Sequence, residues 1–502
     1  GVLFRGGEEG EIRKNLIENN HIDAIIGLPA NIFFGTGIPT IIMVLRQKRE
    51  NTDVLIIDAS KGFIKEGKNN KLRASDIKRI ADNFIKRESV PKFSRVVSRE
   101  EIRSNDYNLN IPRYVDSSEA AEHWDVYASM FGGIPTAEID ELSEFWTAFP
   151  ALKKALFTES EIPYANVSVN DIKSAIKSHP DVVGFEDAFN AAFASFPTFL
   201  KEELIERMES VEISKAETVL SADIFERLKD IPLIDKYAAF QLLDDDWTGI
   251  SIDLEMLQTE GFAAAKKVDP NLVIKKKDGK DQEVQEGWVG HIFPFDLVQA
   301  TLLSAETDEL HGLESRLAEI PSEYESILDE MTEEDKESCN DVLTEESDAF
   351  VPKEVSKKIK ELKKDRSPES VALRTLLEKV ESLVKREKEI KAEIKAKSAD
   401  LQAKTKDTIE NLSDEQALDL LEKKWIAPLI ESIHKLPDTV IDSLVSKIQA
   451  LQNKYATTFF EVEQQISETE AKLSEMIDDL EGNEYDMLGL SELKKLLGGS
   501  AK

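Results

Sequence analysis

The residues best suited to chemistry lie in an aromatic loop, residues 27–40, which reads Gly-Leu-Pro-Ala-Asn-Ile-Phe-Phe-Gly-Thr-Gly-Ile-Pro-Thr. Two adjacent rings at its centre are followed by residues that favour turns, and together these are Phe33, Phe34, Gly35, Gly37 and Pro39. Glycine adopts backbone conformations closed to other residues, so the loop can turn sharply beside the rings. A ring held at the rim of a sheet could stack on a nucleic-acid base turned out of its helix, which contributes about 1–3 kcal/mol per base.

A structural interpretation of the same loop stays open, with Phe33 and Phe34 as core side chains beside a glycine-rich turn. The loop is not a phosphate-binding loop. Its segment Gly35-Thr-Gly37 lacks a third glycine at dinucleotide spacing, and no Gly-Lys-Ser or Gly-Lys-Thr follows it. The residues alone therefore offer two alternatives, a stacking site and a core turn.

Three apolar runs around the loop, residues 22–28, 40–45 and 53–58, predict strands. Continuous β-branched runs indicate burial on both faces, as in a sheet covered by helices. Three strands and one helix, at residues 8–20, are too few for such a sheet. The sequence also opens in an apolar run that begins with Gly1 rather than with Met. We therefore expect the remaining strands to lie upstream of the given sequence.

A further helix is predicted at residues 75–87, and the α/β domain is predicted to end at residue 115. Residues 116–300 carry recurrent helical patterns and end in two strand-like runs at 272–289, joined at Asp278-Gly279, which is a hairpin signal. The Lys275–Lys277 cluster fits either a solvated strand edge or a contact with DNA or a partner. This middle domain is predicted to be mainly helical with a small β hairpin.

Residues 301–502 are predicted to form long coiled-coil helices for subunit assembly. A first run follows the alternating spacing of a heptad seam: Leu376, Val380, Leu383, Ile390, Ile394 and Leu401. A second run does so with one stutter: Leu444, Ile448, Leu451, Tyr455, Phe459, Val462, Ile466, Leu473, Met476 and Leu480. Such seams are typical of coiled coils. We expect the two runs to pair with each other around residues 428–437.

Charge is distributed unevenly along the 502 residues. The formal net charge is −34, but residues 1–115 hold 20 Lys and Arg against 15 Asp and Glu, a balance of +5, which leaves −39 for residues 116–502. Only the first part could face a polyanion without a large electrostatic cost. Its candidate phosphate contacts, for which ordinary surface charge is the favoured explanation, are Arg5, Arg13, Lys14, Arg46, Lys48 and Arg49.

The single cysteine, Cys339, excludes a disulfide within the chain and fits a reducing cytosol, so we expect a cytoplasmic protein. No run approaches the roughly 18 apolar residues of a membrane span. No His and Cys cluster has the spacing of a zinc site. Neither a membrane nor a metal is therefore predicted.

Several motifs over residues 1–116 resemble, in the same order, the modification (M) subunits of type I restriction–modification systems. They are Gly1–Lys14, Ile22–Thr40, Ile57–Ser60, Asn69–Arg73 and Asn105–Val115. The resemblance is moderate over Trp124–Ala137 and weak beyond it. It implies a Rossmann-like domain that transfers a methyl group from S-adenosylmethionine to N6 of adenine in DNA. The expected fold is then an α/β remnant, the end of that sheet, followed by a mainly helical region.

The resemblance also implies how the aromatic loop is used. In the family, a flipped adenine is held between a ring of an Asn-Pro-Pro-Phe motif and a second ring from a later loop. This makes Phe33 the second ring and Phe34 the alternative. The Asn side chain and a Pro carbonyl of that motif accept the hydrogens of the exocyclic nitrogen while the methyl donor is held in line.

The sequence departs from the family pattern because it contains no Asn-Pro-Pro or Asp-Pro-Pro. In the family, this motif and the cofactor loop lie amino-terminal to the position of Gly1. We therefore expect no catalytic and no cofactor-binding residue in this chain. S-adenosylmethionine is expected on the missing upstream part, and the chain alone is expected to be inactive.

The family further implies assembly with DNA, a second M subunit and a specificity subunit, and, for cleavage, with a restriction or motor subunit. The heptad helices at residues 370–480 suit docking against helices of the specificity subunit. A hypothesis of a different class is a non-catalytic coiled-coil scaffold that keeps a remnant α/β domain. The charge of −39 on residues 116–502 and the heptads support that alternative.

Overall fold

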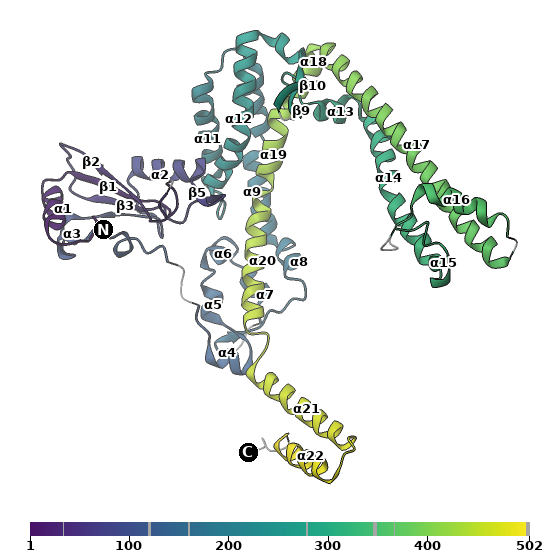
Figure 1. Ribbon diagram of the computed structural model, residues 1–502. Helices are drawn as coiled ribbons and strands as arrows, with labels where there is room; N and C mark the ends of the chain where they lie inside the picture. Colours follow the sequence, from purple (N-terminus) through teal and green to yellow (C-terminus); the bar gives the residue numbers. More distant parts are fainter. Residues whose placement is uncertain are drawn as a thin grey trace. The chain divides into compact units, whose positions relative to one another are not determined.

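In the computed structural model the chain divides into two compact units. Figure 1 labels their helices and strands. The described residues are 1–33, 35–118, 122–158, 161–277, 280–344, 349–365 and 367–497. The first unit contains Gly1–Thr198, Ser214–Thr248 and Leu429–Lys502, and the second contains Phe199–Ile213 and Gly249–Pro428. The chain therefore leaves the first unit and later returns to it. The three domains expected from the sequence stay predictions.

A four-stranded sheet opens the first unit, with strands in the order β2-β1-β3-β6. The strands are β1 (Ile22–Gly27), β2 (Ile41–Leu45), β3 (Val54–Asp58) and β6 (Ser94–Val97). β1 and β3 are parallel, whereas β2 and β6 run antiparallel to their neighbours. Every residue of β1 and β3 is buried, as their continuous apolar runs predict. The three predicted strands and the mixed α/β start are therefore confirmed.

The edge strand β2 departs from this pattern of burial. In the described part of the chain it pairs only with β1, and its side chains are half covered, with Ile42 47% and Leu45 55% exposed. The prediction of burial on both faces is wrong for β2. An apolar run indicates a surface suited to burial, but it cannot supply the neighbour that buries it.

Helices cover both faces of the sheet. They are α1 (Glu8–Glu18), α2 (Ala74–Lys86) and α3 (Arg99–Ser104). Ile17 of α1 and Ile102 of α3 join the core on one face, and Phe84 of α2 packs against the core on the other. The helices predicted at residues 8–20 and 75–87 are confirmed as α1 and α2, within two residues of their ends.

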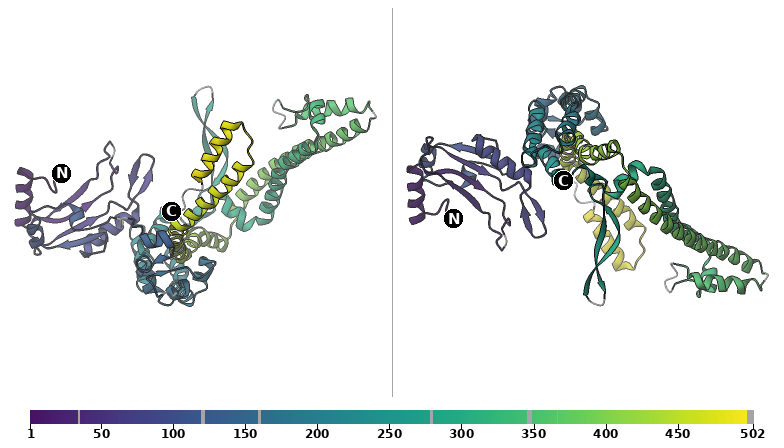
Figure 2. Two further views of the ribbon diagram at one scale, coloured as in Figure 1. Left: turned by 90° about the horizontal axis from the view of Figure 1, so that it is seen from below. Right: turned by 90° about the horizontal axis from the view of Figure 1, so that it is seen from above.

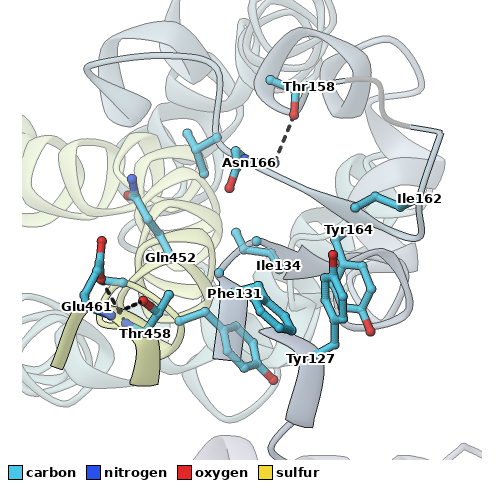
Figure 3. A pocket seen from close by; sticks show the side chains of 15 residues that line it. Tyr127, Phe131, Ile134, Thr158, Ile162, Tyr164, Asn166, Gln452, Thr458 and Glu461 are labelled. Carbon is cyan, nitrogen blue, oxygen red and sulfur yellow. Dashed lines mark hydrogen bonds between the residues drawn. The ribbon is translucent and has the colours of Figure 1, made fainter. Parts of the chain in front are cut away.

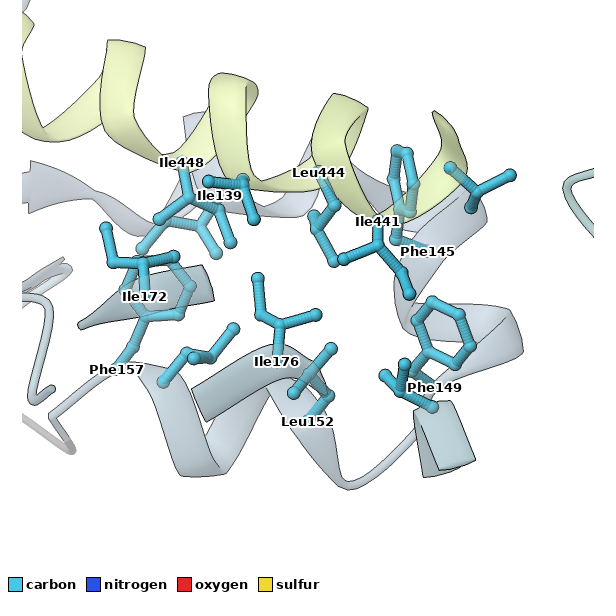
Figure 4. Close-up of a cluster of buried hydrophobic side chains, with 14 of the residues drawn as sticks. Ile139, Phe145, Phe149, Leu152, Phe157, Ile172, Ile176, Ile441, Leu444 and Ile448 are labelled. Carbon is cyan, nitrogen blue, oxygen red and sulfur yellow. The ribbon is translucent and has the colours of Figure 1, made fainter. Parts of the chain in front are cut away.

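The rest of the first unit is mainly helical. Its helices are α4 (Val126–Phe131), α5 (Thr136–Asp140), α6 (Ser143–Ala148), α7 (Leu152–Leu156), α8 (Ile172–Lys177), α9 (Pro180–Phe193), α11 (Ile213–Leu228), α20 (Leu436–Lys454), α21 (Phe459–Asp478) and α22 (Glu484–Leu497). α20 packs into a core formed by residues 134–185, where Ile441, Leu444 and Ile448 face Ile176 and its neighbours (Figure 4). Segments far apart in the sequence therefore share one core.

Two further short strands lie in the first unit, and several helices cross the borders of the units. β7 (Ile134–Pro135) pairs with β8 (Tyr164–Ala165) in the first unit. The helices that cross the borders of the units are α10 (Phe196–Leu200), α12 (Lys236–Glu260) and α19 (Ala427–His434), together with α11, whose first residue belongs to the second unit. None of the helices in the described ranges has the length and apolar character needed to cross a membrane.

The second unit holds a long helical pair and a β hairpin. Its helices include α13 (Phe295–Leu302), α14 (Ser304–Glu330), α15 (Glu333–Ser338), α16 (Pro352–Leu362), α17 (Pro368–Glu410) and α18 (Asp414–Leu421). α17 runs antiparallel to α14, because Arg386 pairs with Glu323 (3.0 Å) while the later Lys397 pairs with the earlier Glu309 (2.6 Å). The mainly helical character predicted after the α/β start is confirmed.

The hairpin predicted near residues 272–289 is confirmed as β9 (Val268–Lys277) and β10 (Lys280–Gly290), which Figure 2 shows as a two-stranded ribbon. Its turn at Asp278-Gly279 and the side chain of Lys277 lie outside what the structure describes. Lys275 pairs with Glu286 across the ribbon, as expected for a solvated strand edge.

The two heptad runs do not have the partners predicted for them. The first run lies in α17, which packs against α14 in the second unit. The second run lies in α20 and α21 of the first unit, where Leu444 and Ile448 are buried in the core and Phe459 is 58% exposed. The predicted pairing of the two runs is wrong, because heptad spacing shows that a helix has an apolar face but not which neighbour covers it.

Candidate functional site

The aromatic loop leaves the sheet at the carboxyl end of β1, beside the carboxyl end of β3. Gly27 and Asp58 are the paired last residues of these parallel strands. The Leu28 N–H donates to the Thr40 carbonyl (2.9 Å) and closes the base of the loop. In open α/β sheets, ligands bind outside the carboxyl ends of the strands. The fold therefore places the loop where a ligand site is expected.

Phe33 is presented to solvent, with 54% of its surface exposed. Gly35 follows in a left-handed conformation, with φ of +81°, and Gly37 and Pro39 are exposed. Phe34 lies outside the described residues. The core interpretation is therefore wrong for Phe33, since a core phenylalanine would be enclosed. An exposed ring is available for stacking.

A small hairpin holds the aromatic loop from one side. It consists of β4 (Ile64–Glu66) and β5 (Asn69–Lys71). The Asn70 side chain donates from Nδ2 to the carbonyl of Ala30 (2.8 Å), and the Asn70 backbone N–H donates to the carbonyl of Asn31 (2.9 Å). These two bonds fix the loop just before its aromatic residues. Sequence reasoning missed this brace, and no spacing in the sequence marks it.

Asp58 is the buried carboxylate at this edge of the sheet, only 8% exposed. Its Oδ1 accepts from the Ser60 N–H (3.0 Å), and its Oδ2 accepts from the Ser117 hydroxyl. Gly27 opposite it packs closely, because an added Cβ would lie 2.6 Å from Cδ1 of Ile111 and would require that side chain to shift. Asp58 therefore ties chain segments together and is not a free general base.

Two of the predicted phosphate contacts, Arg13 and Arg49, are structural instead. Arg13 is buried and donates to two backbone carbonyls (2.6 and 2.7 Å). Arg46 and Arg49 pair with the buried Asp23 (3.0 and 3.1 Å). Burial lowers the pKa of both Arg13 and Arg49. The enclosed guanidinium groups of Arg13 and Arg49 therefore do not present free charge to a ligand, whereas the Arg46 side chain is 58% exposed.

A basic pocket of 290 Å³ lies beside Asp58 at the same edge. The cations that line it are Lys61, Arg73, Arg79 and Lys92. Arg73 is held by two hydrogen bonds of 3.0 Å to Asp76, which raise the pKa of Arg73. The Arg79 guanidinium lies over the ring of Phe93 (4.6 Å). The edge that presents Phe33 is thus also positively charged.

An aromatic pocket of 680 Å³ is a second concave site in the first unit (Figure 3). Tyr127 stacks on Tyr164 (4.5 Å between ring centroids) and also meets Phe131 (5.0 Å). Gly132 lets the start of α21 approach, since an added Cβ would lie 3.3 Å from Cγ2 of Thr458. Polar side chains, among them Asn166, Gln452 and Glu461, line the pocket together with these rings, and no pattern recognised in the sequence indicated it.

The part of the chain that carries the aromatic loop is similar to known proteins. Residues 1–123 match the family model described as N-6 DNA Methylase. This segment is therefore similar to N-6 DNA methylases. We call residues 1–123 the methylase segment after this match, and it contains the sheet, the aromatic loop and the β4–β5 hairpin.

Curated relatives agree with this family. The Type I restriction enzyme MpnII methylase subunit of Mycoplasma pneumoniae is 33% identical over 172 residues, which are 34% of this chain and 31% of that protein. The Type I restriction enzyme MjaVII methylase subunit of Methanocaldococcus jannaschii is 41% identical over 132 residues, 25% of this chain and 23% of that protein. The chain thus covers less than a third of the length of each.

A solved structure is also similar in sequence over part of the chain. The type I restriction-modification system methyltransferase subunit from Streptococcus thermophilus is 53% identical, over 24% of this chain and 25% of that chain, with a TM-score of 0.23. The family match and the named relatives favour the methylase hypothesis over a non-catalytic scaffold.

Proposed function

We propose that this chain is part of the methylase subunit of a type I restriction–modification system, which transfers a methyl group from S-adenosylmethionine to N6 of adenine in DNA. The observation that carries the proposal is the exposed ring of Phe33, on a braced loop within the methylase segment. Phe33 stacks on an adenine turned out of the duplex, and Phe34 is the alternative. Gly35, Gly37 and Pro39 shape the loop around the ring.

Stacking is the step that these residues perform. Turning a base out of the duplex costs a few kcal/mol, and an aromatic face offsets about 1–3 kcal/mol of that cost. A base held by its face keeps its edge free, so N6 can approach a methyl donor. Because Asn70 holds the loop through Ala30 and Asn31, the ring is in place before the base arrives and little order is lost on binding.

The residues present at this edge do not fit S-adenosylmethionine by themselves. Asp58 is already bonded to Ser60 and Ser117, and Gly35 lies in an exposed turn. The half-exposed apolar side chains of β2 support a sheet that continues beyond this strand. We therefore propose that the cofactor and an Asn-Pro-Pro-Phe motif belong to a part of the subunit outside these 502 residues, and that this sheet is the end of a Rossmann-like domain.

The helices α21 and α22 are the proposed docking surface for partner subunits. Their exposed apolar side chains are Phe459, Phe460, Val462, Ile466, Leu473, Met476, Tyr485, Met487, Leu488, Leu493 and Leu496. Exposed apolar faces of this extent mark interaction sites, and heptad spacing suits helices of a specificity subunit in a coiled coil. A second M subunit, a restriction or motor subunit and DNA complete the proposed cytoplasmic assembly.

The proposed stacking is tested with the 502-residue chain and a duplex oligonucleotide that carries one bulged adenine. The bulged base is already outside the helix, so the chain needs no other part of the enzyme to capture it. The comparison duplex has an abasic residue in the bulge. Fluorescence anisotropy should show about 5- to 150-fold tighter binding of the adenine bulge, which corresponds to about 1–3 kcal/mol of stacking.

Variants assign this preference to a residue. Phe33→Ala should abolish the preference for the adenine bulge, and Phe33→Trp should preserve it because the ring face is kept. Phe4→Ala is the matched control, since Phe4 is also 54% exposed and lies in the same unit. Equal binding of both duplexes by the unmodified chain, or an unchanged preference in Phe33→Ala and Phe34→Ala, would refute the stacking role.

A further inference from the structure

We propose that the β4–β5 hairpin holds the DNA backbone, with Lys65 and Lys68 contacting phosphates beside the nucleotide whose base stacks on Phe33. The inference rests on the proposed function, because it requires DNA to reach the aromatic loop. Phosphate contacts fix the register of a protein on a duplex, whereas contacts to the bases distinguish one nucleotide from another. The hairpin supplies the first kind of contact and the aromatic loop the second.

The segment around the hairpin is basic in an acidic chain. Residues 59–73 contain four lysines and one arginine against a single acid, a balance of +4, whereas the whole chain carries −34. Most of the surface repels a polyanion, so a local group of cations has to hold it. The basic pocket beside Asp58 adds Lys92 from another segment to the same edge.

The cations of this segment differ in their partners. Lys71 pairs with Glu66 (3.0 Å), and Arg73 is bound to Asp76 through two hydrogen bonds. Three exposed lysines have no ion pair among the residues that the structure describes: Lys61, Lys65 and Lys68. The charges of Lys71 and Arg73 are therefore neutralised by neighbouring carboxylates, and the other three lysines remain free to meet an external anion.

Strand register turns one of these free lysines toward the aromatic loop. Lys65 is directly opposite Asn70 in the hairpin, so the two side chains leave the same face. On this face the Asn70 side chain reaches the Ala30 carbonyl of the aromatic loop (2.8 Å). Lys71 is one residue further along the strand, and its side chain therefore leaves the opposite face. Lys65 is thus placed on the side of the stacking ring.

The turn of the hairpin presents the second lysine. Gly67 has a positive φ of +63°, which allows the tight turn between β4 and β5, and Lys68 follows it at the tip. The hairpin is joined to the aromatic loop through the two hydrogen bonds of Asn70. A phosphate bound by Lys65 and Lys68 is therefore held at a fixed offset from the ring of Phe33.

The test measures how binding of the 502-residue chain to the adenine-bulge duplex depends on salt. Each phosphate contact contributes about 0.9 to the slope of log affinity against log salt concentration. We expect Lys65→Gln to lower the magnitude of this slope by about 0.9, and the double variant with Lys68→Gln to lower it by about 1.8. Lys71→Gln is the matched control, because it removes the same charge from the opposite face of the same hairpin, and it should leave the slope nearly unchanged.

The outcomes separate this inference from the stacking role of Phe33. A lower slope in Lys65→Gln with an unchanged preference for adenine over the abasic bulge supports the inference. An equal drop in Lys65→Gln and Lys71→Gln, or no drop in either, overturns it while the adenine preference still reports on Phe33. If the unmodified chain shows no preference for adenine but the salt slope still falls only in Lys65→Gln, the backbone contact is supported. Only the stacking role of Phe33 is then refuted. Circular dichroism checks that the variants, all at exposed positions, keep their fold.

Discussion

Replacing Asn70 with alanine tests whether the brace on the aromatic loop has the importance that the structure gives it. The substitution removes the bond from Nδ2 to the Ala30 carbonyl (2.8 Å) and leaves the backbone bond to Asn31 in place. A half-buried hydrogen bond of this kind contributes about 0.5–1.5 kcal/mol. A loss of about 1 kcal/mol lowers the population of the braced loop, and hence the preference for the adenine bulge, by up to about fivefold. No charge changes, so the salt dependence should stay the same.

Anisotropy with the adenine and abasic bulge duplexes measures this effect directly. Asn69→Ala is the matched control, because Asn69 lies in the same strand but its side chain leaves the other face, opposite Glu66. It should keep the full preference for adenine. If Asn70→Ala binds both duplexes like the unmodified chain, the hydrogen bond does not position the ring, and our account of the loop is wrong.

Two further predictions concern docking and acid stability. Ile466→Asp combined with Leu473→Asp in α21 should abolish co-purification with a specificity subunit. The free energy of unfolding should change by no more than about 0.5 kcal/mol per site, because both side chains are already exposed (54% and 44%). Retained co-purification would exclude this docking surface. Hydrogen bonds from Arg103 and Tyr107 lower the pKa of Glu18 from 4.5 to about 2. The contribution of the Glu18 carboxylate to folding stability is therefore complete above about pH 4.5 and is lost as the pH falls toward 2. Glu18→Gln should therefore unfold at lower urea concentration at neutral pH but differ little near about pH 2, and equal midpoints at neutral pH would contradict this.

Much of the sheet could be predicted from the sequence, because β1 and β3 are continuous apolar runs that only a doubly covered strand accommodates. The exposure of Phe33 could not. Two adjacent phenylalanines fit a core as well as a surface, and the deciding contact joins Asn70 to Ala30, 40 residues apart. A side chain that reaches a backbone carbonyl over such a separation leaves no periodic trace in the sequence.

The arginines and lysines show the same limit of prediction from sequence. Arg13 and Arg49 are indistinguishable in the sequence from surface residues, yet both are nearly enclosed, and the free lysines lie on a hairpin too short to produce a strand pattern. The heptad runs are a third case. The seam of α17 packs against α14, whose Leu313, Leu317, Ile320, Tyr324 and Ile327 follow the same heptad spacing, but spacing alone does not say which two helices pair.

The shared core around α20 has a consequence for the order in which the chain folds. Ile441, Leu444 and Ile448 complete a core whose other members lie at residues 134–185, and between them the chain forms most of the second unit, Gly249–Pro428. During synthesis, the apolar side chains of residues 134–185 emerge long before their cover does, whereas the second unit is nearly contiguous in sequence and can close as soon as it leaves the ribosome. The second unit can therefore mature before residues 134–185 are covered, and an interrupted translation product leaves this part of the first unit open to chaperones and proteases.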